Sequence, residues 1–171
     1  VVEELLHGGN EVHVVVTRNG EKVMDFELEG GFRDFLENTG ALNGDLKIHD
    51  IDDLFAPISS GSFPTDGMAV VPCSMSTLGE IASGSSKNLL GRAADVCIKE
   101  GRNLVLVPRE TPLSPIHLEN MLRLSRTGVT IMPAMPGFYN KPRHVRDLVD
   151  FMAGRVLDSL GVENRLYEKW S

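Results

Sequence analysis

The chain has 171 residues, a length that fits one domain rather than two. It carries 17 Lys and Arg against 24 Asp and Glu, and its net charge of −7 argues against non-specific nucleic-acid binding, which needs a basic face. Its apolar fraction of 42% and charged fraction of 24% exclude a disordered chain and are typical of a globular domain.

No apolar run approaches the roughly 20 residues that a membrane helix needs, and no signal peptide is visible, so we expect neither. Cys73 and Cys97 have neither CxxC nor metal-ligand spacing. The simplest interpretation is a reduced, cytoplasmic protein. We expect one domain over residues 1–171, in which residues 161–171 form a C-terminal tail.

The chain opens with a helical pattern that starts midway, because Val2, Leu5 and Leu6 share one face before a Gly-Gly-Asn helix end. Short apolar runs then predict strands, which are residues 12–16, a weaker 47–50, 68–71, 104–107 and 129–132. Helical spacing predicts the intervening helices, which are residues 19–24, a segment around 32–36, then 74–82, 88–99, 116–125 and 143–160. Pro72 is expected to end the third strand, and Thr17 can cap the helix that follows the first.

Strands and helices alternate, and each strand is a nearly continuous apolar run, which indicates a parallel sheet covered on both faces. We therefore expect a three-layer, Rossmann-like (flavodoxin-like) α/β fold. Three strands end in proline, at Pro72, Pro108 and Pro133, and lead into polar residues. Ligands of open α/β sheets bind outside the carboxyl ends of the strands, so these segments are candidate ligand sites.

Two hydroxyl-rich segments could bind an anion. Residues 74–77 stand between a strand and a helix, where hydroxyls and free backbone N–H groups can cradle one. The pattern alone favours simple capping there, including a capping box of Thr77 and Glu80. Residues 59–62 belong to a long Ser-, Gly- and Pro-rich loop, 56–67, which could form a backbone nest for phosphate or only a flexible turn.

Charged residues form two further clusters. Arg92, Asp95 and Lys99 share one face of a predicted helix, for which a solvated face with an internal ion pair is the usual explanation. Arg109 and Glu110 directly follow a strand. Such an adjacent cation and carboxylate could bind an anion and move a proton, or could form a surface pair.

Arg155 lies about 20° from Leu148 on a helical wheel, at the edge of the apolar stripe of the last helix. A guanidinium there needs a partner, either a structural aspartate or a bound phosphate or carboxylate. Tyr139 lies in a Gly- and Pro-punctuated loop, residues 136–142. The five histidines show no ligand spacing, so no metal is assigned.

Three segments carry a resemblance to a known family: 72–100 (PCSMSTLGEIASGSSKNLLGRAADVCIKE), 104–128 (LVLVPRETPLSPIHLENMLRLSRTG) and 131–142 (IMPAMPGFYNKP). The VPRETP and PGFY motifs in this order are specific. From about residue 12 to 162 the chain resembles the flavin prenyltransferases (UbiX-type), within the flavin-dependent cysteine-decarboxylase-like flavoproteins.

The resemblance implies metal-independent transfer of a dimethylallyl group from dimethylallyl phosphate to N5 and C6 of reduced FMN. The product, prenylated FMN, would serve a UbiD-type decarboxylase that acts on aromatic or ubiquinone-precursor acids. The resemblance also implies a homo-oligomer, typically a dodecamer, with sites shared between subunits.

The resemblance also implies roles for individual residues. Flavin contacts are implied for Thr17, Ser74, Met75, Ser76, Thr77 and Arg109. Contacts with the prenyl phosphate are implied for Ser59, Ser60, Lys99, Arg109, Tyr139 and Arg155. Glu27, Arg92 and Glu110 are implied as charged catalytic residues, with Glu110 the candidate for proton transfer near flavin N5 or C6. These residue types suit the reaction, because cations stabilise a phosphate leaving group as its charge grows.

The sequence departs from the family at its start, since nothing in it matches the family's opening strand and Gly-Ser loop. We expect such a segment before residue 1, because a sheet without its central strand would expose a large apolar slot. Two alternatives stay open. One is an FMN-dependent decarboxylase of a peptidyl-cysteine or phosphopantothenoylcysteine, with His49 as the nearby candidate base. The other is a non-catalytic flavin-binding subunit of a decarboxylase complex.

Overall fold

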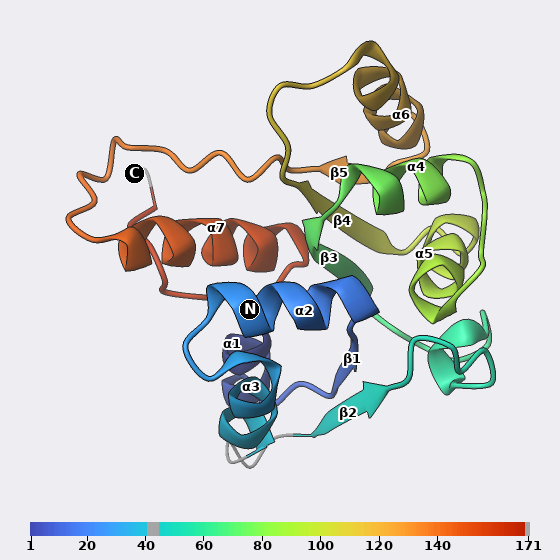
Figure 1. The fold of residues 1–171 in the computed structure, drawn as a ribbon, viewed down its shortest axis with the longest axis horizontal. Coiled ribbons are helices and arrows are strands. Elements are labelled where there is room, and N and C mark those ends of the chain that lie inside the picture. Colours follow the sequence, from blue (N-terminus) through green and yellow to red (C-terminus); the bar gives the residue numbers. More distant parts are fainter. Residues whose placement is uncertain (41–44, 170–171) are drawn as a thin grey trace.

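The computed structural model describes residues 1–40 and 45–169, in which strands and helices alternate (Figure 1). The strands are β1 (Val12–Val15), β2 (Leu46–His49), β3 (Gly67–Cys73), β4 (Asn103–Pro108) and β5 (Thr130–Ile131). The helices are α1 (Val2–His7), α2 (Arg18–Glu27), α3 (Gly31–Gly40), α4 (Met75–Ala82), α5 (Leu89–Lys99), α6 (Pro115–Ser125) and α7 (Val145–Ser159), with a 3-10 turn η1 (Pro57–Ser59). The predicted α/β class is confirmed.

The strands form two parallel sheets rather than the single sheet that was expected. β1 pairs with β2 in one sheet, and β3, β4 and β5 pair in that order in the other. Within the described residues, no strand bridges β1 and β3. The carboxyl ends of neighbouring strands therefore share an edge in each sheet, as the parallel arrangement requires.

Strand β4 separates the helices into two layers. Leu104 and Leu106 pack into a core with α4, α5 and α6, whereas Val105 and Val107 pack into a second core with Val156 of α7. Successive side chains of a strand point to opposite faces, so α5 and α7 cover opposite faces of this sheet. The expectation of helices on both faces is confirmed (Figure 1). No helix in the described ranges is long and apolar enough to cross a membrane.

The prediction that Pro72 ends β3 is wrong. The strand continues to Cys73, whose carbonyl oxygen accepts a hydrogen bond from the backbone N–H of Arg109 at 3.3 Å. The register with β4 is irregular between Val70 and Cys73. Proline has no N–H to donate, and an irregularity in the pairing is where a strand tolerates it.

Helix α7 begins at Val145, two residues later than predicted, because the chain before it is used for capping. The Asp147 carboxylate accepts from the backbone N–H groups of Arg143 and His144, at 2.7 and 3.0 Å. These hydrogen bonds hold the pKa of Asp147 below its ordinary value. The N-terminal half of the predicted apolar stripe faces outward, with Val145 77% exposed.

Candidate active site

Ser74 begins helix α4 at the carboxyl end of β3. Its hydroxyl accepts a hydrogen bond from the Thr77 backbone N–H at 3.1 Å and lies 2.9 Å from the Thr77 hydroxyl. The predicted capping box of Thr77 and Glu80 is therefore wrong, because Ser74 is the N-cap and Thr77 lies within the helix. The N–H groups of Met75 and Ser76 belong to the first turn, whose donors a helix cannot satisfy itself. Residues 74–77 thus combine capping with a set of donors that suits an anion or a polar ring.

Four further predicted residues lie on or beside α2 and the end of β4, and two of them, Glu27 and Arg109, are close to each other. Thr17 caps α2 as predicted, with its hydroxyl accepting from the Gly20 N–H at 2.9 Å. Helix α2 ends at Glu27, whose carboxylate lies 3.8 Å from the Arg109 guanidinium. Both side chains are more than half exposed, so this pair is open to a ligand. Glu110, beside Arg109, is also exposed and accepts from the Thr111 backbone N–H at 3.0 Å.

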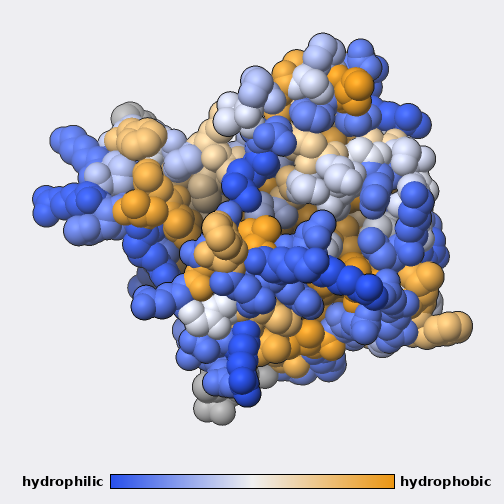
Figure 2. Space-filling model, viewed as in Figure 1, coloured by the Kyte–Doolittle hydropathy of each residue, from blue (hydrophilic) through white to orange (hydrophobic). Residues whose placement is uncertain are grey.

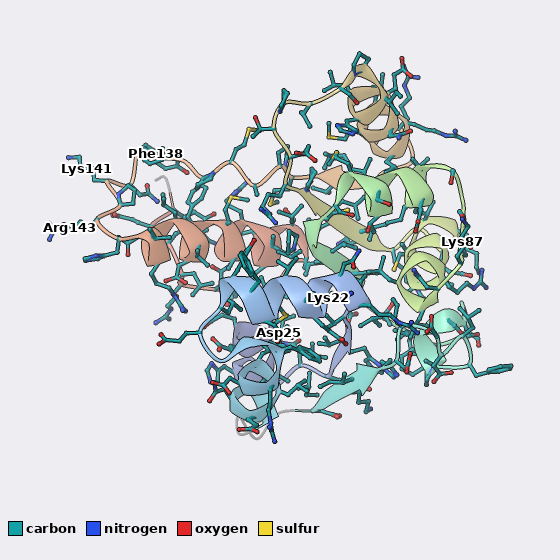
Figure 3. All side chains as sticks on the ribbon, viewed as in Figure 1. Lys22, Asp25, Lys87, Phe138, Lys141 and Arg143 are labelled. Carbon is teal, nitrogen blue, oxygen red and sulfur yellow. The ribbon has the colours of Figure 1, made fainter. Side chains whose placement is uncertain are left out.

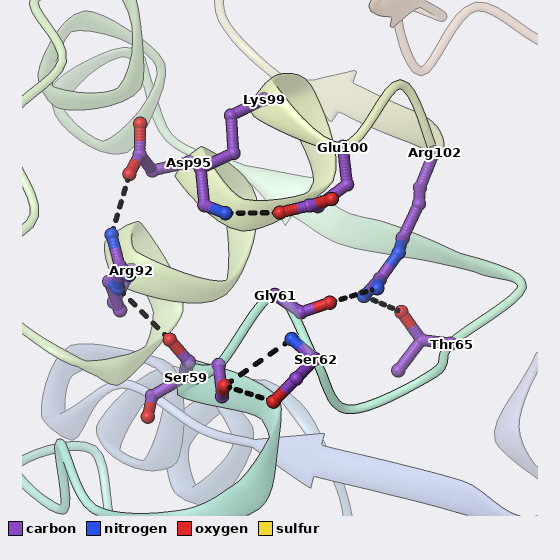
Figure 4. Close-up of polar contacts among 10 residues, drawn as sticks. Ser59, Gly61, Ser62, Thr65, Arg92, Asp95, Lys99, Glu100 and Arg102 are labelled. Carbon is purple, nitrogen blue, oxygen red and sulfur yellow. Dashed lines mark hydrogen bonds and ion pairs between the residues drawn. The ribbon is translucent and has the colours of Figure 1, made fainter.

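A second group of predicted residues lies where the 59–65 loop runs along α5 (Figure 4). Arg92 donates from Nε to the Ser59 carbonyl oxygen at 3.0 Å and pairs with Asp95 at 2.8 Å, so the predicted internal ion pair is confirmed. Lys99 does not join it and pairs with Glu100 instead. A Cβ atom on Gly61 would lie 2.5 Å from Lys99 Nζ. The loop that carries Ser59 and Ser60 therefore reaches Lys99.

The sequence reasoning missed two residues of this group. Glu100 forms an ion pair with the Lys99 ammonium group. The hydrogen bond from Lys99 holds the pKa of the Glu100 carboxyl below its ordinary value. Arg102 donates to the Gly61 carbonyl oxygen at 2.7 Å and to the Thr65 hydroxyl at 3.1 Å. The only sequence signal for Arg102 is a basic residue between a predicted helix and strand, and this signal names no partner.

Arg155 lies on α7, together with a C-terminal segment that folds back on that helix. Its position at the edge of a buried stripe is not observed, since its side chain is 49% exposed. The guanidinium donates to the Tyr167 hydroxyl at 3.3 Å and lies 3.7 Å from Asp158, which is a structural aspartate partner of the predicted kind. The hydrogen bond to Tyr167 raises the pKa of Arg155. Nothing in the sequence pattern signals Tyr167.

Tyr139 joins this group through aromatic contacts. Its ring meets Phe151 edge to face at 5.8 Å, and Phe151 meets Tyr167 in the same way at 5.1 Å. Figure 3 shows the neighbouring residues Phe138 and Lys141 on the extended loop at one side of the molecule, far from Lys87, which precedes α5. The loop bearing Tyr139 therefore belongs with α7 and not with the Lys99 group.

Of the three predicted phosphate cations, Lys99 lies apart from both Arg109 and Arg155. Lys99 lies before the start of β4 and Arg109 follows its end, and these six strand residues span roughly 20 Å at about 3.3 Å per residue. Arg155 lies on the opposite face of the sheet from Lys99, because α5 and α7 cover different faces. One hollow, of about 340 Å³, is lined mainly by α2, α3 and β2. Another, of about 200 Å³, is lined by residues of the 137–142 loop, α7 and the C-terminal segment. None of the three cations lines either hollow.

The cysteines and histidines have environments that do not favour nucleophilic or metal chemistry. Burial raises the pKa of the Cys73 thiol to about 12, which makes it a poor nucleophile. His13 and His49 contact each other through ring nitrogens at 2.8 Å, and burial lowers the pKa of His49. Among the residues that the structure describes, no group of three or more His, Cys, Asp or Glu side chains is arranged to hold a metal ion.

The chain is similar to known flavoproteins over nearly its whole length. Residues 1–157 match the family model described as Flavoprotein. Flavin prenyltransferase UbiX of Halalkalibacterium halodurans is 51% identical over 174 residues, which cover 99% of this chain and 84% of the relative. The crystal structure of AnUbiX (PadA1) in complex with FMN and dimethylallyl pyrophosphate has a TM-score of 0.92 at 44% identity, covering 99% of this chain and 87% of that one. A dodecameric FMN-dependent Ubix-like decarboxylase from Escherichia coli O157:H7 has a TM-score of 0.90 at 48% identity, covering 99% and 90%.

Proposed function

The chain belongs to the flavoprotein family and, within it, to the flavin prenyltransferases of the UbiX type, and we propose that it prenylates reduced FMN. The transferred dimethylallyl group would come from dimethylallyl phosphate and reach N5 and C6 of the flavin. The observation that carries this proposal is the similarity over 99% of the chain to AnUbiX, a protein solved with FMN and dimethylallyl pyrophosphate.

The donor groups near the carboxyl ends of the strands suit FMN. The first-turn N–H groups and hydroxyls of residues 74–77 and the Arg109 guanidinium are hydrogen-bond donors, as a flavin with carbonyl oxygens and a phosphate requires. Thr17, residues 74–77 and Arg109 would hold it there. When bound, reduced FMN supplies the electron-rich ring atoms that form the new bonds.

The protein's own residues would act on the donor's leaving group and on protons. Lys99, Arg109 and Arg155 would bind the phosphate and stabilise the charge that it gains as the allylic C–O bond breaks. Tyr139 would add a hydroxyl donor to the phosphate, and Ser59 and Ser60 would contact the phosphate from the Lys99 group. Glu110 would move a proton near N5 or C6, while Glu27 and Arg92 would be the remaining charged catalytic residues.

A complete phosphate site would need more than one copy of the chain. Lys99 lies about the length of β4 away from Arg109 and on the opposite face of the sheet from Arg155, so we infer that one copy would supply Lys99 to a phosphate held by another copy. Large apolar side chains are exposed, among them Phe55, Ile116 and Phe138, and apolar patches interrupt the hydrophilic surface (Figure 2). We infer a homo-oligomer, and by analogy with the E. coli relative a dodecamer, which native mass spectrometry would count.

We infer where the product goes and where the protein is located. The product would be taken up by a UbiD-type decarboxylase, and the test is whether it restores activity to such an enzyme purified without its cofactor. We place the protein in the cytoplasm, where its free, buried Cys73 and Cys97 would stay reduced.

The test of the proposed reaction is the mass of the flavin after incubation. The protein would be loaded with FMN, reduced without oxygen and mixed with dimethylallyl phosphate, and the flavin would then be extracted. We expect a gain of one dimethylallyl unit, absent when the donor is omitted and greatly reduced in Glu110→Gln. An unchanged flavin from FMN-loaded protein would contradict the proposal.

A further inference from the structure

Arg102 connects the start of β4 to the loop that carries Ser59 and Ser60. Its guanidinium donates from Nη2 to the Gly61 carbonyl oxygen at 2.7 Å and from Nη1 to the Thr65 hydroxyl at 3.1 Å (Figure 4). The side chain is only partly exposed. Two hydrogen bonds from one planar, rigid group fix both distance and direction, which a single bond does not.

Two arginines hold the loop at different points, and Arg102 is one of them. At the other, Arg92 donates to the Ser59 carbonyl oxygen at 3.0 Å. Between these points the Ser60 and Ser62 hydroxyls lie 2.9 Å apart. The only regular structure at the start of the loop is the short turn η1, so the path of the loop depends on these side-chain contacts together with backbone turns and the packing of Phe63 against His13.

The point that Arg102 holds is also where the loop meets Lys99. The absent Cβ of Gly61 would lie 2.5 Å from Lys99 Nζ, so the backbone at Gly61 passes directly beside the ammonium group. Arg102 binds the carbonyl of that same residue. Loss of this hydrogen bond would change the spacing between the loop hydroxyls and Lys99, although the hydroxyls and Lys99 would all still be present.

We propose that Arg102 is a positioning residue for the prenyl phosphate, which holds the 59–65 loop at the correct distance from Lys99. Two of its donors bind the Gly61 carbonyl and the Thr65 hydroxyl, so it acts through the loop rather than on the phosphate. This inference rests on the proposed function, because it takes the loop and Lys99 as phosphate ligands.

The test compares Arg102→Met, which keeps the length of the side chain, with Arg102→Lys, which keeps the charge and one donor. We expect the KM for dimethylallyl phosphate to rise about tenfold in Arg102→Met and less in Arg102→Lys, as the loss of a charged hydrogen bond predicts. The KM for FMN and kcat should change less than twofold, because the flavin donors lie at the other edge of the sheet. Arg126→Met, at an exposed arginine that ends α6, is the matched control and should leave all three constants unchanged.

A binding measurement separates this inference from the proposed reaction. Inorganic phosphate, titrated against protein loaded with FMN, should bind about tenfold more weakly to Arg102→Met than to the wild type, whether or not prenylation occurs. If Arg102→Met does not fold, Thr65→Val removes one of the two contacts and should raise the phosphate Kd severalfold. An unchanged Kd and KM in a folded variant, or an equal loss of FMN and phosphate binding, would overturn the proposal.

Discussion

A single methyl group at Gly61 should separate catalysis from folding. In Gly61→Ala the new Cβ would meet the ends of two flexible side chains, Glu100 and Lys99, with Lys99 Nζ only 2.5 Å away. Both ends can swing into solvent, and alanine also restricts the unfolded chain. We therefore expect the free energy of unfolding to change by less than about 1 kcal/mol.

The effect of Gly61→Ala on the binding of dimethylallyl phosphate should be larger than its effect on stability. If Lys99 must move, the phosphate loses a charge-assisted hydrogen bond worth about 1.5–3 kcal/mol, which corresponds to a roughly 10- to 150-fold fall in kcat/KM for dimethylallyl phosphate. Steady-state kinetics with varied donor, together with thermal unfolding, would measure both quantities.

The control for this change is Gly79→Ala in α4. A Cβ there would lie 3.5 Å from Asn120 Nδ2, an ordinary contact, and the substitution favours a helix by up to about 1 kcal/mol. It should raise stability and leave kcat/KM unchanged. A Gly61→Ala protein with wild-type kcat/KM would refute the placement of Lys99 beside the loop as a phosphate site.

Three further predictions concern buried, capped and tightly packed groups. The Cys73 thiol, with its pKa raised to about 12 by burial, should not react with a thiol reagent at pH 8 until the protein is unfolded; rapid labelling of folded protein would contradict this. Two backbone N–H groups lower the pKa of Asp147, so its stabilisation is present above its unfolded pKa and is lost as pH falls through the folded value. The stability difference between wild type and Asp147→Asn, from denaturant curves, should therefore shrink from pH 7 to pH 3, and a constant difference would argue against it. Gly154→Ala would place a Cβ 2.5 Å from the Tyr167 ring, which should displace the C-terminal segment from Arg155, speed its proteolysis and raise the KM for the donor, whereas wild-type proteolysis would show that the packing adapts.

The sequence predicted elements best where local forces decide them. The apolar run at β4 identified a buried strand, and Thr17 identified the start of α2, because each signal lies within a few residues. Proline at position 72 misled the prediction, since an irregular pairing with β4 lets the strand continue. The exposed start of α7 also could not be foreseen, because helical spacing shows which residues share a face but not what covers it.

In the candidate site, too, local features were predictable from the sequence and tertiary contacts were not. The residues of the candidate site were predicted from motifs and a family resemblance, and near-neighbour partners such as Asp95 follow from helical spacing, whereas other partners come from distant positions. Arg102 contacts Gly61, and Arg155 contacts Tyr167, through tertiary packing that no local spacing encodes. The separation of the cations onto different surfaces likewise follows from strand alternation at β4, which became visible only when each helix was assigned to a face.

Mixing two inactive variants tests the account's central claim, that copies of the chain complete one phosphate site together. Lys99→Ala and Arg155→Ala would each be severely impaired alone. In oligomers co-assembled at random from equal amounts, about one quarter of sites would receive an intact Lys99 from one copy and an intact Arg155 from another. The account predicts that prenylation of FMN returns to about a quarter of the wild-type rate. Mixed oligomers as inactive as their parents would contradict it.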